Sequence, residues 1–81
     1  MVEEKQIRDV IAAYVVDGDA EKFVLDFGEL SYNIHKEGTP EAEDLANRVM
    51  FRMSDVYAKL ITREQFRESL KNFILQGSFN G

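Results

Sequence analysis

The chain has 81 residues, is 44% hydrophobic, contains no cysteine and carries a net charge of −5. A chain of this length forms one small core, and without cysteine neither a disulfide nor a thiolate metal site can support it. The acidic balance argues against direct nucleic-acid binding, which needs a basic face. The first residues lack the basic start and apolar run of a signal peptide, and no stretch resembles a membrane span, so we expect a cytoplasmic protein without membrane contact.

The first predicted element is an amphipathic helix over residues 3–16. Its apolar residues recur at intervals of three and four, at Ile7, Val10, Ile11 and Tyr14. The segment Asp17-Gly18-Asp19 then interrupts the pattern. Gly18 can adopt the left-handed conformation that ends a helix, and Asp19 can cap the first amides of the next one.

The second predicted helix covers residues 20–36. Its apolar stripe steps by four, three and four residues through Phe23, Phe27, Leu30 and Ile34. Gly38 marks its end, and Thr39-Pro40 then reads as an N-cap followed by a proline at the first helical position.

The third predicted helix covers residues 40–60 and is expected to be the longest and most central. Its stripe runs through Leu45, Val49, Met53, Val56 and Leu60. Phe51 lies off this stripe. We expect it to pack against a loop or the edge of a neighbouring helix rather than to stand exposed as a binding aromatic.

The fourth predicted helix covers residues 63–76, with Phe66, Leu70, Phe73 and Ile74 as its stripe and Thr62-Arg63-Glu64-Gln65 as a capping box. Short connections at residues 17–19, 37–40 and 61–62 make successive helices antiparallel neighbours. The sequence therefore predicts an all-α fold, an antiparallel four-helix bundle in one domain spanning residues 1–81.

Catalytic and metal chemistry finds little support in the sequence. His35 is the only histidine, and its place in the last turn of the second predicted helix is explained by the helix dipole. Asp17, Asp19 and Glu21 alternate as in a calcium loop, but Lys22 stands where that loop requires glycine. Ser31 and Ser54 both lack the Asp-Ser-Leu context of an acyl carrier protein. We therefore expect no enzyme activity, no metal and no cofactor.

Negative charge is concentrated in the middle of the chain. Residues 17–44 hold nine acidic residues against Lys22 and Lys36, a net charge of −7, whereas the remaining residues sum to +2. Such an asymmetry affects association and steering rather than fold, and it points to a basic partner.

The order of features from Tyr14 to Leu70 resembles a known family. A helix ending in Tyr14-Val15-Val16-Asp17-Gly18 restarts at once with Ala20-Glu21-Lys22-Phe23, and Met50-Phe51, Ser54-Asp55-Val56-Tyr57 and Thr62-Arg63-Glu64-Gln65-Phe66-Arg67 follow. This order is similar to that of the bacterial self-protective colicin-like immunity proteins. The resemblance implies an all-helical inhibitor that binds a basic nuclease toxin of the tRNA-cleaving type and covers its active site with acidic groups.

The family's toxin contacts vary, so the candidate contacts rest on charge clustering and expected exposure. The candidate partner-binding residues are Asp17, Asp19, Asp26, Glu29, Tyr32, Glu37, Glu41, Glu43 and Asp44. Tyr32 has two open interpretations, a partly exposed aromatic anchor or a residue at the core boundary. The alternative function is a small helical interaction or regulatory module, monomeric or homodimeric, without a toxin partner.

Overall fold

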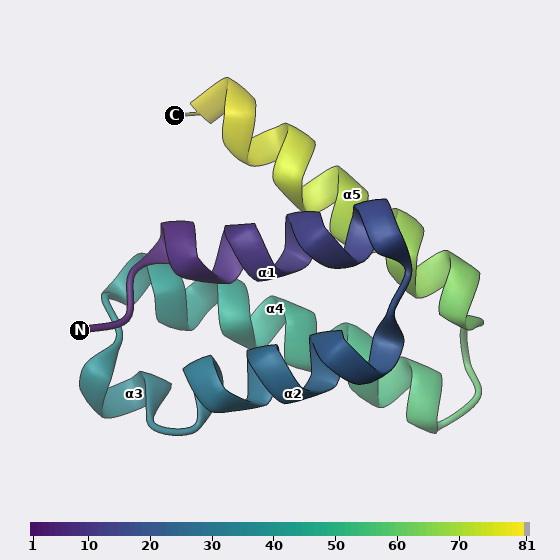
Figure 1. Cartoon of the computed structure of the whole chain (residues 1–81), viewed down its shortest axis with the longest axis horizontal. Helices are drawn as coiled ribbons and strands as arrows, with labels where there is room; N and C mark the ends of the chain where they lie inside the picture. The colour runs from purple at the N-terminus through teal and green to yellow at the C-terminus, as the bar shows by residue number, and fades with distance from the viewer. Residues whose placement is uncertain (81) are drawn as a thin grey trace.

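The computed structural model describes the backbone of residues 1–80 and the side chains of residues 1–74. These residues form five α-helices and no strand, which confirms the predicted all-α class. The helices are α1 Glu4–Asp17, α2 Ala20–Ser31, α3 Ile34–Glu37, α4 Pro40–Tyr57 and α5 Arg63–Asn80 (Figure 1).

The predicted helix-terminal signals are present as local hydrogen bonds. Gly18 ends α1 in the left-handed conformation, with φ of 69°, and its amide donates to the Tyr14 carbonyl. Asp19 then accepts the Lys22 amide at 3.1 Å. Thr39 caps α4 by accepting the Ala42 amide at 3.1 Å, and Thr62 exchanges two bonds with Gln65 before α5. These caps satisfy amides that the first turn of a helix leaves without a partner.

The second predicted helix, residues 20–36, is interrupted at residues 32 and 33 and is therefore two helices instead of one. The chain leaves the helix after Ser31 and resumes as the one-turn α3 at Ile34, with Asn33 as the N-cap at φ of −122°. Ile34 is buried and α3 packs on α4. A straight helix would have continued along the α2 axis, so the break directs this residue into the core beside α4.

Two other predicted boundaries are also wrong. The third helix ends at Tyr57 instead of residue 60, because Lys59 takes a left-handed conformation with φ of 62° and Leu60 turns outward. The backbone bonds from Leu60 to Asp55 and from Lys59 to Val56 close this turn. The fourth helix extends past the predicted end at residue 76, to Asn80.

Helix α1, rather than the predicted residues 40–60, occupies the centre of the arrangement. It packs against α2, α4 and α5, whereas α3 touches α4 and α5 also rests on α4. Figure 1 shows α1 and α2 running in opposite directions, with α5 crossing α1 at a steep angle. The antiparallel four-helix bundle stays a prediction.

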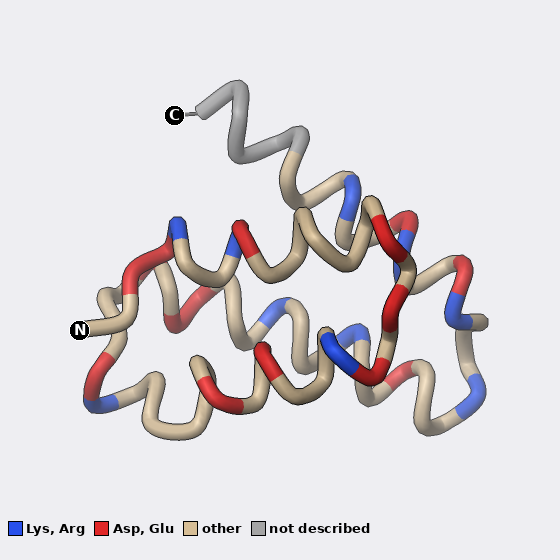
Figure 2. The backbone as a smooth tube through the Cα atoms, in the orientation of Figure 1, with Lys and Arg blue, Asp and Glu red and all other residues tan. Residues whose placement is uncertain are grey.

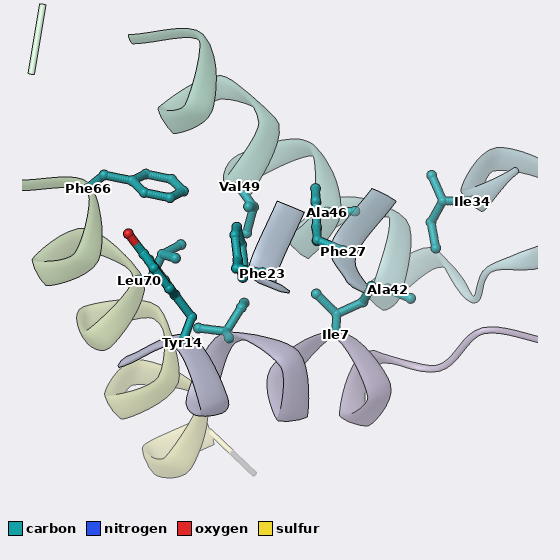
Figure 3. Close-up of a cluster of buried hydrophobic side chains, with 11 residues drawn as sticks. Ile7, Tyr14, Phe23, Phe27, Ile34, Ala42, Ala46, Val49, Phe66 and Leu70 are labelled. Atoms are coloured by element: carbon teal, nitrogen blue, oxygen red, sulfur yellow. The ribbon is translucent and has the colours of Figure 1, made fainter. Parts of the chain in front are cut away.

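The core is a single apolar cluster in which three aromatic rings gather at one end, and Ala42 and Ala46 lie among larger side chains toward the other. Tyr14, Phe23 and Phe66 come from α1, α2 and α5, and Figure 3 shows them gathered at the end away from Ile34. The Tyr14 and Phe23 rings stack with centroids 4.8 Å apart, and Phe66 meets Phe23 edge-on at 5.9 Å. Ala42 and Ala46 on α4 let helices approach closely at the other end.

Two contacts between distant segments hold the helix ends in place. The Val2 amide donates to the Glu37 carbonyl, and the Thr39 amide donates back to Val2, so the N-terminal residues pair with the α3–α4 connection. Arg67 of α5 donates from Nε to the Val15 carbonyl at 3.1 Å, covering the last turn of α1. A cation at this position also complements the negative end of the helix dipole.

Candidate functional site

The outer face of α2 carries apolar side chains that the core does not use. Phe23 and Phe27 turn inward, while Leu25, Gly28, Glu29 and Tyr32 share the opposite side at helical intervals of three and four residues. Leu25 is 68% exposed and Tyr32 is 83% exposed. Gly28 has no side-chain or distant backbone neighbour within 4 Å of the position that a Cβ would occupy. We call these four residues the α2 outer face.

Tyr32 is therefore not a residue of the core boundary. Its exposure is compatible with the anchor interpretation, which stays a prediction. Leu25 was missed in the sequence analysis, although a signal was present: it lies two residues from both Phe23 and Phe27 and so falls outside their stripe. An exposed Leu and Tyr two turns apart on one helix are typical of helix-mediated recognition.

Three of the candidate acidic residues meet at the start of α2. Asp17, Asp19 and Asp26 line one shallow hollow between α1 and α2, together with Lys22. Asp17 accepts the Asp19 amide at 2.8 Å, and its carboxylate lies 4.0 Å from the Lys22 ammonium. Asp17 and Asp19 thus stabilise the turn through hydrogen bonds and also give it negative charge. Asp26 is half-buried and forms no ion pair among the described residues.

The remaining acidic candidates lie at the other end of α2 and beyond. Glu37 ends α3, and Glu41 and Glu43 occupy the first turn of α4, where acidic side chains complement the helix dipole. Asp44 is paired with Arg48 at 3.2 Å one turn along the same helix. These positions have explanations within the fold and are weaker candidates for partner contacts.

The acidic segment consequently spans the molecule instead of forming one compact patch. Figure 2 shows acidic positions at the α1–α2 turn, along α2, and again around α3 at the opposite end of the long axis. The structure brings Asp17, Asp19 and Asp26 together and places Glu29 and Tyr32 on one side of α2. It separates this group from Glu41, Glu43 and Asp44.

Phe51 corrects a second expectation about aromatic residues. It is 76% exposed and packs against neither a loop nor a neighbouring helix edge. With Asn47, Met50 and Ser54 it lines an open hollow on one side of α4. Because α4 already buries Ala42, Ala46 and Val49, its opposite side remains outside the core.

Neither a metal-binding group nor a membrane span is visible in this structure. Within residues 1–74 no three acidic or histidine side chains converge as metal ligands would. The helices between residues 1 and 80 include none whose length and apolar character would suffice to cross a bilayer.

Comparisons with protein-family models, with curated proteins and with solved structures yield no match for this chain.

Proposed function

We propose that this protein is an immunity-type inhibitor whose α2 outer face and adjoining acidic turn bind a basic nuclease toxin. The observation that carries the proposal is the exposure of Leu25 and Tyr32 on either side of Glu29. Exposed large apolar side chains on one helix face lose stabilising burial unless a partner covers them.

Charge complements this apolar pair. Asp17, Asp19 and Asp26 line the hollow between α1 and α2, and Lys22 is the only cation that lines it among the described side chains. A surface of this composition attracts a basic protein, accelerates encounter and disfavours acidic partners. The catalytic face of an RNA-cleaving toxin has this basic character because it grips phosphates. Inhibition then follows from occlusion, with no turnover and no cofactor.

The shape of α2 also suits recognition by a flat or grooved partner. Gly28 leaves open space in the middle of the face, so a partner backbone can approach between Leu25 and Tyr32. The Tyr32 side chain supplies a large contact area at a low cost in conformational entropy. The proposal includes the antiparallel bundle arrangement of α1, α2, α4 and α5, with α2 presented on one side.

The test first asks whether a neighbouring gene encodes a basic nuclease domain, and then measures binding of the purified chain to that domain together with inhibition of tRNA cleavage. Tyr32→Ser should weaken binding by about 2 kcal/mol, or about 30-fold, because central aromatic anchors dominate interface energies. Glu29→Lys should weaken binding further. This loss of affinity should be larger at low salt, where electrostatic interactions are least screened.

Matched controls lie on other helices. Phe51→Ser removes an aromatic ring of similar exposure from α4, and Glu68→Lys makes the same charge change on α5. Both should bind as the parent chain does. If no neighbouring gene encodes a basic nuclease domain, or if the Tyr32 and Glu29 variants inhibit as well as their controls, the inhibitor proposal is wrong.

A second candidate function is self-association through α4. Its observation is the exposed Phe51 beside Met50, on a helix side that also carries the small or polar Asn47 and Ser54. Two copies of such a side can pack helix against helix around a two-fold axis. Sedimentation velocity should then show a concentration-dependent mass that Phe51→Ser abolishes, and a monomer at millimolar concentration would rule this out.

A further inference from the structure

An apolar cavity that is open to solvent on one side lies where four helices meet, apart from the α2 outer face. This cavity measures about 360 Å³ and is bounded by the aromatic cluster of Tyr14, Phe23 and Phe66, with Met53 contributing from α4. Figure 3 shows these three rings converging from α1, α2 and α5. Its volume is within the range of about 300 to 1,000 Å³ for small-molecule sites.

The charged side chains that line the cavity are basic despite the acidity of the chain. Lys59 and Arg63 line it, and no aspartate or glutamate among the described side chains does. Neither cation forms an ion pair with any carboxylate of residues 1–74. Two unpaired cations beside an apolar, aromatic space complement a ligand with an apolar body and an anionic end.

Lys59 stands out for an independent reason. It is the one non-glycine residue with positive φ in residues 1–80, at 62°. A left-handed conformation is unfavourable for a residue with a Cβ, and helices that end this way normally place glycine there. A lysine held in this conformation at the rim of a cavity motivates a functional hypothesis for its side chain.

We propose that this cavity binds a small apolar monocarboxylate. The tail lies against Phe23, Phe66 and Met53, and the carboxylate lies at the edge formed by Lys59 and Arg63. Charge-assisted hydrogen bonds from an ammonium and a guanidinium hold the carboxylate, while aromatic and thioether groups cover the tail. Two sources share this chemistry, an aliphatic acid from lipid and an aromatic acid.

In the first experiment the full chain is titrated with decanoate and with 4-phenylbutyrate. Calorimetry and amide chemical shifts measure the binding. Decanoate should bind with a Kd of about 1 mM or lower, in keeping with its size, and shift amides around Val24, Lys59 and Phe66. The tighter of the two acids identifies the class of tail. Decyltrimethylammonium, which has the same tail and the opposite charge, should not bind. Failure of both acids, or equal binding of the cation, overturns the proposal.

The second experiment uses Lys59→Gly, whose two effects run in opposite directions. Affinity for decanoate should fall at least about threefold, because one partner of the carboxylate is lost. Tm should rise by about 4 °C or more, because the strain at this position is relieved. A purely structural role for Lys59 would change Tm and leave affinity unaltered.

Arg63→Gln should also weaken decanoate binding, whereas Lys71→Gln removes a cation outside the cavity and should leave it unchanged. If Lys59→Gly and Arg63→Gln both bind decanoate as the parent chain does, the assignment is wrong. No nuclease enters these measurements, so their outcome is separate from that of the inhibitor proposal.

Discussion

Two turns at the same end of the molecule use the same backbone conformation with different residues. The α1–α2 turn places Gly18 at φ of 69°, and the α4–α5 turn places Lys59 at φ of 62°. Glycine adopts this conformation without steric cost, whereas for lysine it costs about 1 kcal/mol. The first turn therefore follows the local rule for ending a helix and the second breaks it.

The surroundings of the two turns explain the difference. A Cβ at Gly18 would lie 3.5 Å from the Arg67 guanidinium, which itself bonds the end of α1. This turn is part of the packing between helices. Lys59 is exposed and borders the apolar cavity, so its side chain is available to a ligand. Gly18 suits the left-handed conformation and takes part in helix packing. Lys59 does not suit it, which is consistent with a role for its side chain in ligand binding.

The largest expected effect comes from removing a ring at the centre of the aromatic cluster, at the end of the core that lies near both turns. Phe23→Ala should lower the free energy of unfolding by about 3 to 5 kcal/mol, because Phe23 touches Tyr14, Phe27 and Phe66 in the core. Urea denaturation followed by circular dichroism measures this loss. A loss as small as that of a surface substitution would show that the aromatic cluster does not support the two turns.

Arg67→Met should have the second-largest effect on the free energy of unfolding. Its structural effect should be confined to the α1–α2 turn. It removes the hydrogen bonds from α5 to the Val15 carbonyl while keeping an apolar stem of similar length. We expect a loss of about 2 kcal/mol, since hydrogen bonds to charged groups are worth more than neutral ones. Hydrogen exchange should speed up in the last turn of α1. Unchanged exchange there would contradict the role assigned to Arg67.

Gly18→Ala should cost about 1.5 kcal/mol, because alanine resists the left-handed conformation. The matched control is Gly28→Ala on the α2 outer face, where no neighbour lies within 4 Å of a new Cβ. That control should stabilise the chain by about 0.5 to 1 kcal/mol, since alanine favours a helix interior. Changes of the same sign at both positions would invalidate the contrast.

Of the two turn variants, Lys59→Gly has the smaller expected effect, and its sign is opposite to that of Gly18→Ala. It should raise the free energy of unfolding by about 1 kcal/mol in the same denaturation measurement, by relieving the left-handed strain. If Lys59→Gly lowers the free energy of unfolding instead, lysine is the better residue for this turn. The conclusion that Lys59 is strained there, in contrast to Gly18, is then wrong.

Local signals in the sequence were sufficient for most helix starts and for the first helix end. Asp19, Thr39 and Thr62 each cap a helix through bonds within three residues, so nothing distant is needed to recognise them. The apolar stripes likewise predicted the buried residues of α1 and α2, because a helical period of 3.6 sets which side chains share a face.

The errors lie where a distant partner decides the outcome. Nothing within residues 20–36 requires a break at Asn33, and the break places Ile34 against α4. Leu60 continues the α4 stripe in sequence, but the helix ends before it and the side chain turns outward. Phe51 and Leu25 are exposed because no other helix covers their sides, which a single helical pattern cannot reveal.

The amino-acid sequence by itself determined the all-helical class, four helix starts and the acidity of residues 17–44, because caps, periodicity and charge are properties of neighbouring residues. The tertiary structure alone decided that α1 lies at the centre, that the acidic residues divide between two ends, and that Lys59 and Arg63 border an apolar cavity. These features depend on which helix faces meet, and that choice is made by packing over the whole chain.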